Sequence, residues 1–145
     1  MEYSPLIAPV VALVAWTLVV MLWMLMSRMR EFRRLGINFS NIPPGSRGVD
    51  LEGRADAKAQ WKSHNYNHLM EQPTLFYAVA LSLVIIGDRD PGTLAFAWAY
   101  VGLRIAHSLV QSTVNIVKYR FLLFALASVA LILLTLRFGS LVIRG

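Results

Sequence analysis

The chain has 145 residues, of which 57% are hydrophobic and 15% charged, with a formal net charge of +6 at pH 7 and no cysteine. So apolar a composition argues against an ordinary water-soluble domain, in which about a quarter of the residues are charged. The lack of cysteine excludes disulfides, a thiol nucleophile and thiolate metal ligands. We expect a single domain over residues 1–145 that is integral to a membrane; a soluble all-helical core is the alternative, but it would show amphipathic stripes rather than long uncharged runs.

The first apolar run covers residues 6–26 without a charge, which is long enough to cross a hydrocarbon core of about 30 Å as a helix. A basic loop, residues 27–63, follows it and contains the helix-breaking stretch "NIPPGSRG". Because cytoplasmic loops collect lysine and arginine, we expect this loop in the cytoplasm and both termini on the other side of the membrane. Its charge indicates topology and contact with anionic lipids; binding of nucleic acid or substrate is the less favoured interpretation.

The second span is predicted over residues 67–86, and its N-terminal turns are polar. The uninterrupted apolar run begins only at Pro73, so a helix of about 20 residues ending at Ile86 must include Asn67, His68 and Glu71. An ionisable group at that depth needs a partner or water. The second span therefore indicates a polar site within the membrane.

The third and fourth spans are predicted over residues 93–117 and 119–138, both of sufficient length. Small residues follow one another at helical spacing in the second and third spans, which predicts faces that pack closely against other helices. These residues are Ala78, Ser82, Ala95, Ala99, Gly102 and Ala106.

Each of the two central spans carries one polar stripe at spacings of three and four residues. The stripes are His64, His68 and Glu71 on the second span, and Arg104, His107, Gln111, Asn115 and Lys118 on the third. Both lie at similar depths below the basic end, so two antiparallel helices are predicted to share one polar cleft. A Glu71–Arg104 ion pair that only fixes helix register is the alternative. The basic lining suits a dicarboxylate, and equally a lipid headgroup.

The three side chains of the second-span stripe, His64, His68 and Glu71, also have the spacing of metal ligands, but no second ligand cluster accompanies them, and we expect no metal. The tryptophans and tyrosines are read as interfacial or packing residues.

The second-span sequence "NHLMEQPTLFY" and the third-span sequence "AWAYVGLRIAHSLVQ", with four spans and a long basic first loop, resemble the MAPEG family of membrane-associated proteins in eicosanoid and glutathione metabolism. The resemblance covers nearly the whole chain. It implies an all-α integral membrane fold, a four-transmembrane-helix bundle assembled as a homotrimer. It also implies glutathione bound between protomers near the cytoplasmic face, and a hydrophobic small-molecule substrate that enters from the bilayer. We expect a bacterial member in the inner membrane, with membrane lipids and no nucleic acid among its partners.

Carried over residue by residue, the resemblance implies a cofactor-binding set and two candidates for the cation that activates the glutathione thiol. The binding set is His64, Asn67, His68, Glu71, Arg104, His107 and Gln111. The catalytic candidates near the junction of the third and fourth spans are Arg120 and its rival Lys118; the guanidinium is favoured because it stays charged when partly desolvated. The alternative is that both are positive-inside anchors.

Two functions of different class follow from the resemblance. The first is a glutathione-dependent transferase or peroxidase acting on lipophilic electrophiles or lipid hydroperoxides, favoured by the long polar stripe. The second is a non-catalytic membrane protein of the same fold, a lipid-binding or accessory subunit. It is favoured by His64 and His68, which stand where well-studied eukaryotic members have arginine and asparagine.

Overall fold

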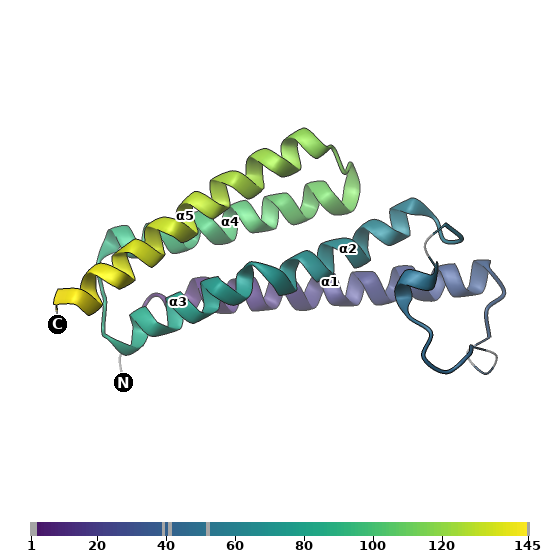
Figure 1. Cartoon of the computed structure of the whole chain (residues 1–145), viewed down its shortest axis with the longest axis horizontal. Helices are drawn as coiled ribbons and strands as arrows, with labels where there is room; N and C mark the ends of the chain where they lie inside the picture. The colour runs from purple at the N-terminus through teal and green to yellow at the C-terminus, as the bar shows by residue number, and fades with distance from the viewer. Residues whose placement is uncertain (1–2, 39, 41, 52, 145) are drawn as a thin grey trace.

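The structure, a computed structural model, describes residues 3–38, 40, 42–51 and 53–144 (Figure 1). The remaining positions, at the ends of the predicted domain and within the predicted loop, lie outside the described residues. The described part is all helical. Its elements are α1 (Ile7–Arg34), the 3₁₀ turn η2 (Gly48–Leu51), α2 (Ala57–Glu71), α3 (Pro73–Ile85), α4 (Pro91–Thr113) and α5 (Val117–Arg144).

Helices α2 and α3 form one continuous rod. Gln72 between them keeps helical dihedral angles, φ −58° and ψ −37°. Pro73 has no N–H, so the hydrogen bond that would reach the carbonyl of Leu69 is missing, and the Thr74 hydroxyl donates to the carbonyl of Glu71 at 2.7 Å. The polar half of the second span, α2, and its apolar half, α3, therefore meet at the proline.

Four rods in the described part of the chain are long and apolar enough to cross a membrane: Ile7–Arg34, Ala57–Ile85, Pro91–Thr113 and Val117–Arg144. Less than half of each apolar window is buried inside the protomer. Large side chains such as Leu22, Leu75, Phe121 and Leu136 instead face outward, each more than half exposed. An apolar outer surface of this extent requires lipid around it. The protein is thus an integral membrane protein with four spans.

The rods pack as two hairpins, α1 against α2 and α4 against α5, joined where α4 contacts α2 and α1. Helices α1 and α2 extend past the α4–α5 turn and carry the connecting segment 35–56, whereas both chain termini lie at the opposite end (Figure 1). We call these the loop end and the terminal end. The core between them includes Phe76 stacked on Tyr100, with ring centroids 4.6 Å apart.

The helices end at different residues from the predicted spans. Helix α1 continues beyond residue 26 to Arg34, and α2 begins at Ala57, where the Asp56 side chain accepts a hydrogen bond from the Lys58 amide at 2.9 Å. The connecting segment is therefore 35–56 rather than 27–63. The helices continue beyond the apolar runs because a helix need not unwind where it leaves the bilayer. Instead, a glycine ends α1 and an N-cap residue begins α2. Gly36, at φ +64°, closes α1 in this way.

At the terminal end, a turn over residues 86–90 is fixed by a buried carboxylate. Asp88 accepts hydrogen bonds from the Thr93 hydroxyl at 2.7 Å and from Nη2 of Arg137 at 3.0 Å. Burial raises the pKa of the Asp88 carboxyl, but the hydrogen bonds from Arg137, Thr93 and the Asp90 amide outweigh that effect and hold the pKa below its ordinary value. Asp90 caps α4 by accepting from the amides of Gly92 and Thr93.

Candidate functional site

The face where α2 meets α4 near the loop end is polar and buried. The Asn65 side chain is buried and donates to the hydroxyls of Ser108 at 2.6 Å and Ser112 at 2.9 Å. Nε1 of Trp16 on α1 donates to the same Ser108 hydroxyl at 2.9 Å. These hydrogen bonds join α1, α2 and α4 at the same depth in the bundle, on the loop-end side of the ionisable residues of the site.

Arg104 lies one turn deeper and is fully buried. Its Nη2 donates to the backbone carbonyl of His68 at 2.7 Å, and its guanidinium carbon lies 5.9 Å from the ring centroid of Phe124. Its Nε and Nη1 have no hydrogen-bond partner among the described residues. Two unsatisfied donors on a buried guanidinium are costly, so the described residues satisfy Arg104 only in part.

His68 and His107 face each other beside this arginine. Their rings are edge to face with centroids 5.2 Å apart, and the His68 ring also lies 5.6 Å from that of Phe124. Nδ1 of His68 is 3.2 Å from a carboxylate oxygen of Glu71, without the angles of a hydrogen bond. The two imidazoles form the floor of a small hollow.

The hollow has a volume of about 210 Å³ and lies between α2, α4 and α5. Its walls combine two imidazoles, one guanidinium and apolar side chains: His68, His107, Arg120, Val117, Phe121 and Phe124. Nη1 of Arg120 donates to the Asn115 side chain at 2.7 Å, while its Nε has no partner among the described residues. Asn115 can reach back because it holds a left-handed conformation, φ +53°, in the α4–α5 turn.

The predicted site residues separate into three groups. His68, His107 and Arg120 line the hollow. Arg104 and Gln111 are buried beside it, and the side-chain oxygen of Gln111 also lacks a partner among the described residues. The other four are exposed, Lys118 on α5 and His64, Asn67 and Glu71 on the outer face of α2, and the side chain of Glu71 is 68% exposed.

Two details of the predicted cleft are wrong, and so is the Glu71–Arg104 ion pair that was the alternative to it. Helix α4 ends at Thr113, so Asn115 lies in the turn and Lys118 on α5; the polar stripe of α4 stops at Gln111. Lys118 is exposed and does not line the hollow. Among the described residues Glu71 and Arg104 form no ion pair. Glu71 points outward because Asn65 and Leu69 occupy the face of α2 that packs inside the protomer.

The uncharged residues that surround the ionisable side chains of the site were not identified from the sequence. Ser108 and Ser112, four residues apart in an apolar helix, signal a hydrogen-bonding face, and their partner Asn65 was passed over for the exposed Asn67. The wall residues Phe121 and Phe124 look like ordinary span residues in the sequence. Only their position opposite α2 makes them part of a site. The described residues contain no group of three metal-ligating side chains close enough to hold a metal ion.

Comparison with known proteins supports one assignment. A comparison with curated proteins and one with solved structures find no significant match. The family model described as "MAPEG family" matches residues 6–140, which includes the first three spans, the fourth span as far as residue 140, and every residue of the hollow. The chain belongs to the MAPEG family.

Proposed function

We propose that the protein is a glutathione-dependent transferase or peroxidase that acts on lipophilic electrophiles or lipid hydroperoxides. The observation that carries this proposal is the hollow itself. Arg120 supplies a guanidinium, whose Nε has no partner among the described residues, beside an aromatic wall that opens among lipid-facing residues of α5. A cation next to an apolar surface suits a reaction between an anionic sulfur and a hydrophobic substrate.

Glutathione suits the donor set of the site. The ligand carries two carboxylates, and guanidinium groups bind carboxylates strongly. The unpartnered donors of Arg104 and the acceptor oxygen of Gln111 have the polarity that its carboxylates and its amide N–H groups need. Bound glutathione would supply the reactive thiol, since the chain has no cysteine.

The chain's contribution to the chemistry is to favour the thiolate. A thiol of ordinary pKa, about 8.5, is mostly protonated near neutral pH, and a neighbouring cation raises the ionised fraction. Arg120 fits this role better than Lys118 because it lines the hollow and is held by Asn115, whereas Lys118 is exposed on α5. The guanidinium also keeps its charge when partly desolvated.

The proposal includes a homotrimer, which the exposed polar face of α2 supports. Arg104, which bonds the backbone of His68, is nine residues from the end of α4, or about 14 Å along the helix. The neighbouring, exposed Glu71 is thus at hydrocarbon depth, where a carboxylate facing lipid would be costly. A neighbouring protomer can cover it. The predicted small-residue faces are available, because Ala95, Ala99 and Gly102 are exposed on α4.

We also propose that the loop end faces the cytoplasm of a bacterial inner membrane, and that residues 1–145 form a single domain. Support for the orientation comes from the basic residues concentrated at the loop end.

A non-catalytic role, as a lipid-binding or accessory subunit, is the second candidate. The specific observation in its favour is that His64, Asn67 and Glu71 are exposed and do not line the Arg120 hollow within the protomer. In a trimer, these three residues of one protomer could reach the hollow of a neighbouring protomer. If they do not, the predicted glutathione-binding residues do not form one site, and the thiol of glutathione is not activated.

The ultraviolet absorbance of bound glutathione thiolate, followed across pH, tests the proposal. We expect an apparent thiol pKa below that of free glutathione in the wild type and in Lys118→Ala, and a return toward the free value in Arg120→Ala. An increase only in Lys118→Ala would move the catalytic role to that residue. A wild-type value equal to the free one would favour the non-catalytic candidate.

A further inference from the structure

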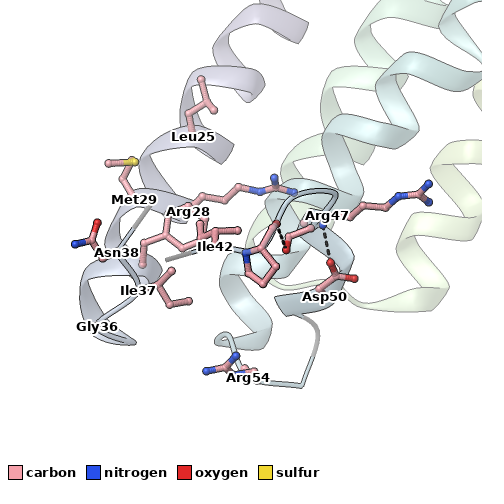
Figure 2. A pocket seen from close by; sticks show the side chains of 14 residues that line it. Leu25, Arg28, Met29, Gly36, Ile37, Asn38, Ile42, Arg47, Asp50 and Arg54 are labelled. Carbon is pink, nitrogen blue, oxygen red and sulfur yellow. Dashed lines mark hydrogen bonds between the residues drawn. The ribbon is translucent and has the colours of Figure 1, made fainter. Parts of the chain in front are cut away.

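A large cavity lies away from the candidate site, at the loop end. It is a groove of about 590 Å³ between the last turns of α1 and the segment that connects α1 to α2 (Figure 2). We call it the interfacial groove. No step of the proposed reaction uses it.

The interfacial groove has an apolar surface to which both α1 and the connecting segment contribute side chains. Helix α1 contributes Leu25 and Met29, which are 46% and 42% exposed, and the connecting segment contributes Ile37, Ile42 and Pro43 (Figure 2). Because Leu18, Leu22, Leu25 and Met29 follow one another along one exposed face of α1, the groove continues the lipid-facing surface of the span.

The rim of the groove is cationic. Arg28, Arg47 and Arg54 line it, against a single carboxylate, Asp50, which already accepts a hydrogen bond from the Arg47 amide at 2.6 Å. Arg28 reaches from α1 toward the connecting segment, and Arg54 lies at another edge (Figure 2). The groove therefore offers a net positive edge above an apolar floor.

Hydrogen bonds and close contacts hold the walls of the groove in place. Nε of Arg28 donates to the Ser63 hydroxyl of α2 at 3.1 Å, and its guanidinium packs so closely under Gly48 that a side chain there would collide with it. The outer wall is held by its own hydrogen bonds, from the Ser46 hydroxyl to the Pro43 carbonyl at 2.8 Å and from the Asp50 amide to the Arg47 carbonyl at 3.0 Å.

Its depth matches the surface of a bilayer. Helix α1 has 28 residues, about 42 Å, and a hydrocarbon core is about 30 Å thick, so roughly eight residues emerge from it. Leu25 to Phe32 thus lie where acyl chains give way to headgroups. We propose that the interfacial groove binds an anionic phospholipid of the surrounding membrane, with the headgroup in the positive field of the arginines around the rim and the upper part of an acyl chain on Leu25 and Met29.

The test measures binding of short-chain phosphatidylglycerol and of phosphatidylcholine with the same chains to the detergent-purified full chain, by native mass spectrometry. Each basic residue near an anionic lipid contributes about 1 kcal/mol, or about fivefold. We expect R47Q/R54Q to weaken phosphatidylglycerol binding about 25-fold and to leave phosphatidylcholine binding unchanged. The matched control R30Q/R33Q removes the same charge from exposed arginines of α1 outside the groove and should retain the affinity.

Two further arms separate the possible occupants. Met29→Asn should weaken both lipids, and Met26→Asn, on an exposed position outside the groove, should not. Glycerol phosphate without acyl chains should fail to compete. Equal losses in the two arginine pairs would overturn the proposal in favour of general surface charge. Competition by glycerol phosphate would overturn it in favour of a free anion, and loss of self-association in R47Q/R54Q without loss of lipid would assign the groove to a second copy of the chain.

Discussion

The two ends of the bundle differ in how completely their buried polar groups are hydrogen-bonded. At the terminal end, the Asp88 carboxylate is matched by Thr93 and Arg137, and the three groups close one turn. At the loop end, Arg104 and Arg120 are brought together with two imidazoles, and several of their nitrogen atoms have no partner among the described residues. The polar groups of the turn at the terminal end are matched within one protomer, whereas those at the loop end are matched only in part by the described residues. This difference separates a structural cluster from a candidate site.

The largest expected effect is stabilisation of the loop end by its ligand. If glutathione binds, a concentration of about 100 times Kd should raise the free energy of unfolding by about 2.7 kcal/mol. Thermal unfolding of the detergent-purified protein with and without glutathione measures this, and glycine at the same concentration is the control. No shift at any concentration would remove glutathione from the site.

At the terminal end, Asp88→Asn should destabilise the fold by about 2 kcal/mol. The change removes the charge that Arg137 and the Thr93 hydroxyl contact in a buried position, although the guanidinium is partly exposed and can be hydrated. Thermal unfolding is the measurement, and Asp50→Asn, an exposed carboxylate in the connecting segment, is the matched control. Glutathione-induced stabilisation should survive in Asp88→Asn, because the two ends are independent.

Lowering the pH should also weaken the Asp88 cluster at the terminal end, with a smaller loss of stability than the Asp88→Asn substitution. The pKa of the folded Asp88 carboxyl is lowered below its ordinary value of 3.8, so its ionised form stabilises the fold above that pH. This contribution should be lost as the pH falls from 3.8 through the folded pKa. Unfolding measured between pH 5 and pH 2.5 should show a loss in the wild type that Asp88→Asn lacks. Identical pH profiles would mean that the carboxylate contributes nothing.

The smallest effect on stability is expected for Arg104→Met. Within the part of the chain that the structure describes, the buried guanidinium makes one hydrogen bond and leaves two donors unsatisfied. An apolar side chain of similar length should therefore change the free energy of unfolding by less than about 1 kcal/mol or increase it. Any stabilisation by glutathione should fall in the same variant. A large loss of stability without ligand would show that a neighbouring protomer already satisfies Arg104.

The predictions from sequence were strongest where a physical rule acts along the chain. Four spans could be predicted because a helix across the hydrocarbon core needs about 20 apolar residues, and the family could be recognised from "NHLMEQPTLFY" and "AWAYVGLRIAHSLVQ". The helix ends were predicted less well. Arg30 and Lys62 are too polar for a span but remain helical, and the turn at Asn115 carries no glycine or proline to mark it.

The sequence by itself determined the membrane class, the number of spans and the types of residue near the site, because composition and helical period are local properties of the chain. Only the tertiary structure decided which of these residues meet. Rotation of α2 about its axis turns Asn65 inward and Glu71 outward, and the end of α4 at Thr113 assigns Lys118 to the outside of α5 and Arg120 to the hollow. Those outcomes depend on how three helices pack against one another, which no periodicity within a single helix can specify.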